Sequence, residues 1–125
     1  MLHSVVQYSS VIIGQFYGHM HRDDLRVIWP EGDRQDAALV ILEAPSIAPN
    51  SDTNPSFRFY YYNTSNYALI DYDEYYTDLI NNYIAGEIVW RLEYSFNDAY
   101  NVRLRSRGGR CTRLTAGRDR VDAGD

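Results

Sequence analysis

Short runs of apolar and aromatic residues, each closed by a turn, most constrain the fold of this 125-residue chain. Such runs are typical of β-strands, whereas an amphipathic helix needs a longer periodic stretch. The chain has 12 tyrosines against four Phe and two Trp, and Tyr suits the half-buried surface of a sheet. We therefore predict a single, strand-rich domain. The predicted strands are Val11–Phe16, Leu25–Trp29, Ala37–Leu42, Phe57–Tyr62 and Val89–Tyr94.

Helical patterns are few. Apolar residues recur at helical spacing in the first nine residues, and Ser95 with Asp98 resembles a capping box that opens a short helix over Phe96–Tyr100. Residues 67–83 fit both periods, and we favour a strand through Leu79. Turns are predicted at Gly18–Asp24, Pro30–Asp36 and Asn63–Asn66, and a long loop that holds three Pro at residues 44–56.

The charge is divided unevenly along the chain. All 12 basic residues are Arg, and the net charge is −5. Residues 1–102 carry five Arg and 14 acidic residues, whereas residues 103–125 carry seven Arg and three Asp. The acidic body argues against a nucleic-acid-binding protein. The Arg/Gly-rich tail has no apolar periodicity, so we predict that residues 103–125 are disordered and lie outside the folded domain of residues 1–102.

Two of the three histidines, His19 and His21, lie in the stretch "GQFYGHMHRDD" behind Gly18. One interpretation is that they are partly exposed polar residues of a turn. The other is that they bind metal, because residues i and i+2 of a turn can direct two imidazoles into one cleft, and neutral imidazole is a common ligand of zinc. Gly18 would let the backbone turn sharply or approach a ligand closely.

The sequence resembles a known family over residues 2–102. "GQFYGHMHRD" is similar to the G-H-x-H block of calcineurin-like metallophosphoesterases. The segments "APSIAPNSDTNPSFRFYYYN", "ALIDYDEYYTDL" and "VWRLEYSFNDAYNV" follow in the order and spacing seen in acid sphingomyelinases and acid sphingomyelinase-like phosphodiesterases. This resemblance implies an α/β fold in which the chain is the C-terminal part of a four-layer α/β/β/α sandwich.

The resemblance also implies a function. The family binds two zinc ions and hydrolyses phosphodiester or nucleotide phosphate bonds, with sphingomyelin or nucleotides as substrates. It implies that His19 is a ligand of one zinc and His21 of the other, and that Gly18 is the motif glycine. Met20 takes a position that is often Thr in the family. We expect Arg22 and Asp23 to hold the turn through side-chain hydrogen bonds.

Other parts of the family's metal site are missing from these 125 residues. There is no D-x-H or G-N-H motif, and the remaining histidine is His3. The Gly-Asp pair in Gly32–Asp36 follows the His pair, and we interpret it as a hairpin turn. Two histidines supply one ligand per zinc, short of the usual four. We therefore expect a fragment of a phosphodiesterase that is inactive alone, or a non-catalytic module that binds a relative or a lipid surface.

Three further expectations concern the cell. Asn63-Thr64-Ser65 is an N-glycosylation sequon. The N-terminal residues lack a basic segment and a continuous apolar run, so we predict no signal peptide in this chain, although the parent family is secreted or lysosomal. No stretch is apolar for long enough to span a membrane.

Overall fold

A computed structural model describes residues 7–8, 11–12, 14–29, 39–49, 52–105 and 113–116. The predicted helix at the start of the chain and the predicted turn at Pro30–Asp36 lie almost entirely or wholly outside these residues, as does His3. The helices described below are therefore labelled from α2. The described chain is a small mixed α/β structure, rich in strands, with two three-stranded sheets and two short helices.

The first sheet has the order β1-β3-β2. Its strands are β1 (Gln15–Tyr17), β2 (Asp24–Ile28) and β3 (Leu39–Glu43). The central strand β3 pairs in parallel with β1 and antiparallel with β2. Leu39, Val40 and Leu42 are buried, which confirms the prediction of a buried strand from the continuous apolar run. The prediction of a strand around Leu25–Trp29 is confirmed by β2.

The prediction of a buried strand over Val11–Phe16 is wrong in its bounds and its burial. The strand begins at Gln15, and Val11 and Phe16 are 72% and 53% exposed. Val11 donates its N–H to the Tyr8 carbonyl at 3.0 Å, so that a local turn competes with strand pairing. Among the described strands, β1 is also an edge strand that pairs with β3 alone.

The second sheet is an antiparallel meander of β4 (Ser56–Tyr62), β5 (Leu69–Thr77) and β6 (Trp90–Ser95). β4 and β6 confirm the predicted strands at Phe57–Tyr62 and Val89–Tyr94. The predicted turn between β4 and β5 is also present, closed by a hydrogen bond from Tyr67 N–H to the Asn63 carbonyl at 2.7 Å. The predicted long loop runs from β3 to β4 and ends one residue earlier than expected.

The predicted strand through Leu79 is wrong at its end, because α2 (Leu79–Ala85) begins there. Asp78 caps this helix by accepting a hydrogen bond from Asn81 N–H at 3.0 Å. Gly86 ends it in the left-handed conformation at φ 73°. The apolar side chains within residues 67–83 fit both the strand period and the helix period. The Asp78 cap decides in favour of a helix from Leu79.

Helix α3 has the predicted bounds, Phe96–Tyr100, but the predicted capping box is absent. The Ser95 hydroxyl donates instead to Asp73 Oδ1 at 2.5 Å, and Asn97 N–H donates to Asp71 Oδ1 at 3.0 Å. The two aspartates lie on β5, the central strand of the second sheet. The first turn of α3 is thus satisfied by a neighbouring strand rather than by its own N-cap side chain.

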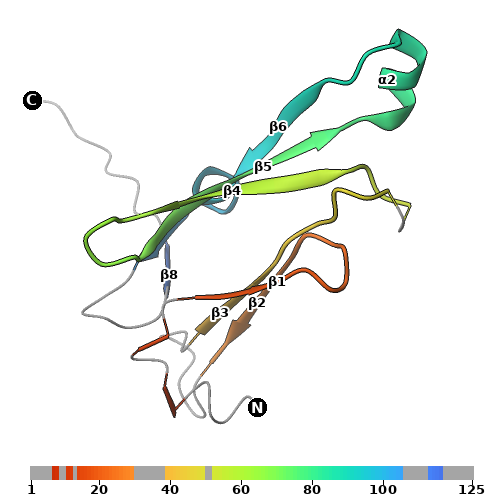
Figure 1. Cartoon of the computed structure of the whole chain (residues 1–125). Coiled ribbons are helices and arrows are strands. Elements are labelled where there is room, and N and C mark those ends of the chain that lie inside the picture. Colours follow the sequence, from red (N-terminus) through yellow and green to blue (C-terminus); the bar gives the residue numbers. More distant parts are fainter. Residues whose placement is uncertain are drawn as a thin grey trace, which may run out of the picture.

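The two sheets face one another across the hydrophobic core (Figure 1). Core residues come from β3, β5 and α3, and they are Val40, Leu42, Leu69, Tyr72 and Phe96. The rings of Phe16 and Tyr60 make an edge-to-face contact between the sheets, with centroids 5.0 Å apart. The helix α2 lies beyond the core, at the far end of the long β5–β6 arm (Figure 1).

The tail differs in part from the prediction of a disordered segment. Two stretches of it, β7 (Val102–Arg105) and β8 (Arg113–Ala116), pair antiparallel. Strand β7 contacts β5 and α3. The remaining residues of 103–125 lie outside the described part of the chain. A domain boundary at residue 102 stays a prediction.

Candidate functional site

The H-x-H turn, residues 18–23, connects β1 to β2, as predicted. A hydrogen bond to the first sheet fixes the backbone of the turn, because Met20 N–H donates to Glu43 Oε1 at 2.6 Å. Glu43 is the last residue of β3 and is only 7% exposed. A buried carboxylate with a backbone partner is a strong anchor, since leaving either group unpaired would cost free energy.

The sharp bend of this turn occurs at His21 rather than at Gly18. His21 has φ 57°, in the left-handed region that a non-glycine residue seldom adopts. Gly18 has no such φ, and a Cβ built there would meet nothing within 4 Å. The turn therefore does not need glycine at position 18 for its backbone conformation. Open space at Gly18 remains compatible with the close approach of a ligand.

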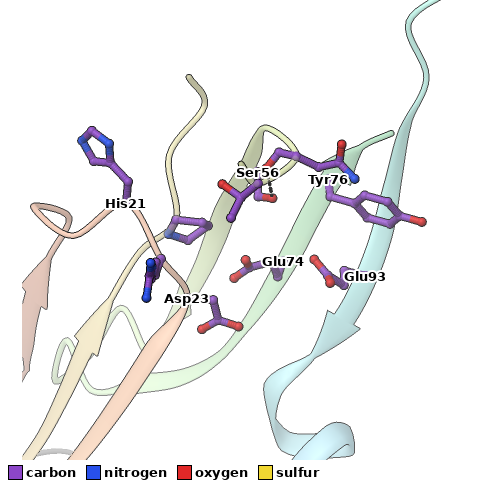
Figure 2. Close-up of a pocket in the computed structure, with 10 residues that line it drawn as sticks. His21, Asp23, Ser56, Glu74, Tyr76 and Glu93 are labelled. Atoms are coloured by element: carbon purple, nitrogen blue, oxygen red, sulfur yellow. Dashed lines mark hydrogen bonds between the residues drawn. The ribbon is translucent and has the colours of Figure 1, made fainter. Parts of the chain in front are cut away.

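His21 lies at the edge of a pocket of about 530 Å³ between the H-x-H turn and the second sheet. The pocket is lined by the H-x-H turn, the 44–55 loop and the second sheet, through His21, Arg22, Asp23, Pro45, Thr53, Asn54, Ser56, Glu74, Tyr76 and Glu93. Figure 2 shows His21 and Glu93 on opposite sides of this pocket, with Glu74 between them. The lining thus holds three carboxylates and one arginine.

The structure brings His21, but not His19, to the pocket lining. His19 is exposed on the turn. Imidazoles at positions 19 and 21 have the donor chemistry that zinc prefers. Within the described ranges, however, no group of three or more His, Cys, Asp or Glu side chains is arranged to hold a metal. The two histidines therefore fit zinc in kind and fall short of a full ligand set in number.

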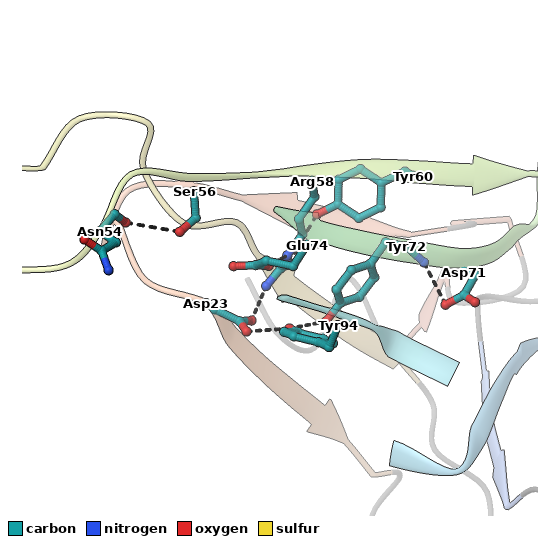
Figure 3. A network of polar contacts seen from close by, with 9 residues as sticks. All are labelled: Asp23, Asn54, Ser56, Arg58, Tyr60, Asp71, Tyr72, Glu74 and Tyr94. Carbon is teal, nitrogen blue, oxygen red and sulfur yellow. Dashed lines mark hydrogen bonds and ion pairs between the residues drawn. The ribbon is translucent and has the colours of Figure 1, made fainter. Parts of the chain in front are cut away.

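A row of polar side chains on the inner face of the second sheet supports the turn. Arg58, Glu74 and Tyr94 are direct neighbours across β4, β5 and β6. Arg58 Nε donates to Glu74 Oε2 at 2.5 Å, and the Arg58 guanidinium lies over the Tyr72 ring, 4.4 Å from its centroid. Asp23 accepts hydrogen bonds from Arg58 Nη2 and the Tyr94 hydroxyl (Figure 3).

The expectation that Arg22 and Asp23 hold the turn through side-chain hydrogen bonds is confirmed for Asp23, although its partners lie on the second sheet, and stays a prediction for Arg22. Arg58, Glu74 and Tyr94 were missed as site residues. A signal was present, because Arg58 and Glu74 are opposite charges within two aromatic strands, at positions of the same parity as the partly buried Tyr60 and the buried Tyr72. Only their register, Arg58 opposite Glu74, makes them a pair.

Burial and pairing determine the charges in this row. Burial opposes the charge of Arg58, but its hydrogen bonds to Glu74 and Tyr60 outweigh this and raise the pKa of Arg58. Burial raises the pKa of Glu74 to about 7, although the hydrogen bond and charge of Arg58 act in the opposite direction. Burial and the hydrogen bond to Asp23 raise the pKa of Tyr94. Tyr94 thus stays protonated at neutral pH and donates to Asp23.

Comparison with known proteins identifies the family of the chain. Residues 37–106 match the family described as "Acid sphingomyelin phosphodiesterase C-terminal region". The chain belongs to this family. The match includes the second sheet with Arg58, Glu74 and Tyr94, whereas the H-x-H turn precedes it. The acid sphingomyelin phosphodiesterase C-terminal region thus forms the surface on which the turn is anchored.

Similarity to whole proteins extends over most of the chain. Cyclic GMP-AMP phosphodiesterase SMPDL3A of Mus musculus is 39% identical over 103 residues, which is 77% of this chain and 22% of the relative. The protein of the same name in Rattus norvegicus is 37% identical over 102 residues, with the same coverage. Sphingomyelin phosphodiesterase B of Dictyostelium discoideum is 33% identical over 108 residues, 82% of this chain and 17% of the relative.

The chain therefore spans about a fifth of the length of these relatives. The relationship confirms the sequence-based family assignment and that the chain corresponds to a C-terminal portion of such proteins. None of the helices in the described ranges is long and apolar enough to cross a membrane.

Proposed function

We propose that the chain supplies the last metal-ligand block and part of the substrate pocket of a zinc-dependent phosphodiesterase of the sphingomyelin phosphodiesterase type. The observation that carries this proposal is that the H-x-H turn borders a pocket whose other walls belong to the family-matched region. His19 would bind one zinc and His21 the other, with Gly18 as the motif glycine. Zinc would add positive charge to the pocket, whose carboxylates alone would repel a phosphate.

The fold is compatible with this assignment. The family's sandwich needs two sheets that face one another, and β1-β3-β2 and β4-β5-β6 do so across one core. We propose that they form part of the two inner layers of the α/β/β/α arrangement. In this arrangement the H-x-H turn lies at the rim, at the ends of β1 and β3, which run parallel.

The pocket chemistry favours one class of substrate. Glu93 faces the same space as Tyr76, and a carboxylate beside an aromatic ring attracts an organic cation. A phosphodiester that carries a quaternary ammonium group, such as the phosphocholine of sphingomyelin, meets this requirement. A dinucleotide carries a further negative charge there instead. We therefore propose a phosphocholine-type substrate over a nucleotide.

The experiment is a chimera. The matching segment of the Dictyostelium Sphingomyelin phosphodiesterase B would be replaced by residues 11–105 of this chain. We expect the chimera to hydrolyse sphingomyelin with zinc, and to lose activity in His19→Ala and in His21→Ala. Met20→Ala, on the same turn, is the matched control and should retain activity. Equal activity in all four proteins would contradict the metal role of both histidines.

The 125-residue chain alone should not hydrolyse phosphodiesters, because it lacks the D-x-H and G-N-H motifs. Turnover by this chain with zinc, above that of a His19→Ala/His21→Ala double variant, would show that the D-x-H and G-N-H motifs are not needed. Isothermal titration with Zn²⁺ on the same two proteins measures binding independently of activity.

A second candidate, a non-catalytic module that binds a lipid surface, is favoured by the end of the β5–β6 arm. Ile80, Tyr83, Ile84 and Ile88 are between 74% and 88% exposed, on and just after α2. Exposed apolar clusters of this kind mark interaction surfaces. Co-sedimentation with phosphatidylcholine vesicles tests it. Binding that is lost in Ile80→Ser/Ile84→Ser supports this function, and no binding by the unaltered chain contradicts it.

The phosphodiesterase proposal also includes a secreted or lysosomal location and glycosylation of Asn63. Asn63 is exposed on the β4–β5 turn, and its Oδ1 accepts a hydrogen bond from Ser65 N–H at 2.8 Å. Expression behind a secretion signal should give a product that shifts on glycosidase treatment. Asn63→Gln should abolish the shift, and an unshifted wild-type product would exclude the site.

A further inference from the structure

Asp23 joins the H-x-H turn to the second sheet. It is the last residue of the turn, two residues after His21 and immediately before β2. Its two carboxylate oxygens have different partners, because Oδ1 accepts from Arg58 on β4 and Oδ2 accepts from Tyr94 on β6. Figure 3 shows Asp23 reaching across to both side chains. One end of the H-x-H turn is therefore held by the second sheet, although the turn connects two strands of the first sheet.

Arg58 is a rigid anchor for Asp23. Its side chain is fully buried, whereas that of Asp23 is 33% exposed. Glu74 holds Nε, and the Tyr60 hydroxyl accepts from Nη1 at 3.4 Å. Since β4 and β5 hold the guanidinium on several sides, Arg58 does not follow Asp23 if the turn moves. A planar guanidinium can bind two carboxylates at once, which lysine cannot do in this geometry.

The other end of the turn is tied to the first sheet through Met20 N–H and Glu43. His21 therefore lies between two anchors, one on each sheet. Its left-handed φ of 57° is unfavourable for a residue with a side chain and persists only where the surroundings impose it. Releasing either anchor should let His21 relax towards ordinary backbone conformations.

We infer that Arg58 is a positioning residue, which holds His21 in its ligand-presenting conformation through Asp23. The inference rests on the proposed function, in which His21 binds zinc. It assigns a role to the acid sphingomyelin phosphodiesterase C-terminal region, because Arg58 and Tyr94 fall inside the match to residues 37–106 while the H-x-H motif falls before it. The C-terminal region would thereby orient a metal ligand that it does not contain.

Asp23→Ala in the full 125-residue chain is the primary test. This variant removes the anchor and leaves Arg58 paired with Glu74, so the inner face keeps its ion pair. Asp24→Ala is the matched control, because Asp24 is adjacent and pairs with the exposed Arg26 at 2.9 Å. Backbone ¹⁵N relaxation of residues 19–22 reports the order of the turn. Zn²⁺ titration of the chimera with the same substitutions reports metal binding, because the relative would supply the remaining ligands.

We expect Asp23→Ala to give loop-like relaxation at His21 in the 125-residue chain and to weaken Zn²⁺ binding by the chimera at least fivefold, with Asp24→Ala within twofold of wild type on both measures. Arg58→Met should give the same loss, and the Asp23→Ala/Arg58→Met double variant should lose no more zinc affinity than either single variant. Unchanged Phe96 and Tyr72 ring resonances in Asp23→Ala verify that the core is intact.

Wild-type relaxation at His21 in Asp23→Ala overturns the inference, whatever the zinc result. Additive losses in the double variant overturn it as well, since they mean that Arg58 acts by another route. If the unaltered chimera binds no zinc, the proposed function fails, and the positioning role is then decided by the order of the turn alone.

Discussion

The H-x-H turn and the second sheet have different roles. The turn holds both candidate ligands, yet His19, Met20 and Arg22 are exposed and none belongs to the core. The sheet holds no candidate ligand, yet Leu69 and Tyr72 are buried in it, and Phe96 packs against it. Candidate metal binding and stability are thus assigned to separate segments, which meet at the contact between Asp23 and Arg58. Substitutions should therefore affect them separately, except at this contact.

The largest effect on stability is expected from the core side. Phe96 is completely buried and stacks on Tyr72 with ring centroids 4.9 Å apart. Phe96→Ala should lower the free energy of unfolding by about 3–5 kcal/mol, since it leaves a cavity that the sheets cannot close. Urea denaturation measures this. Met20→Ala on the turn, where Met20 is 55% exposed, is the contrast and should cost less than about 0.5 kcal/mol. Similar losses in both variants would abolish the distinction.

Arg58→Met tests the contact between the H-x-H turn and the second sheet. Removing the guanidinium leaves the buried Glu74 carboxylate without its partner, so we expect a loss of about 3 kcal/mol in the free energy of unfolding. Arg26→Met is the control, because its pair with Asp24 is solvent-exposed and should contribute far less to stability. If the two arginines prove equivalent in denaturant unfolding, the buried pair has no special role.

Glu74 should make stability depend on pH. Burial raises its pKa from the model-compound value of 4.5 to about 7 in the folded state, so the folded chain binds this proton more tightly than the unfolded chain. The stabilisation is complete below pH 4.5 and is lost as the pH rises through about 7, by roughly 3 kcal/mol at most. Arg58, Asp23 and Glu93 are the charges that act on it.

The measurement compares wild type with Glu74→Gln in urea at several pH values. The free energy of unfolding of wild type should fall relative to that of the variant between pH 4.5 and 7. A difference that rises with pH would mean that Arg58 dominates and that the carboxyl is more acidic when folded.

The smallest effect is expected at Gly18. Its backbone is not left-handed and a Cβ would meet no atom, so Gly18→Ala should change the free energy of unfolding by less than about 0.5 kcal/mol. Gly86→Ala at the end of α2, where φ is 73°, should cost about 1 kcal/mol. In the chimera, a loss of zinc affinity in Gly18→Ala without a loss of stability would assign the glycine to ligand approach.

Sequence patterns were sufficient for elements that depend on local apolar character. The runs at Leu39–Leu42 and Phe57–Tyr62 are strands because continuous or alternating apolar residues bury themselves best in a sheet. The patterns failed where a single local hydrogen bond decides, as at the Asp78 cap that begins α2 and at Ser95, whose hydroxyl turns to Asp73. They also failed for Val11, because edge position and a competing turn are not visible in its hydrophobicity.

For the site, the sequence alone determined the family and the two candidate ligands, because the spacing of His19 and His21 and the segments that follow them are local, ordered features. Only the tertiary structure decided which side chains support them. Arg58, Glu74 and Tyr94 are far apart in sequence, and strand register makes them one row. Asp23 reaches that row because the two sheets face one another, and a charge pair between sheets depends on this packing rather than on any spacing along the chain.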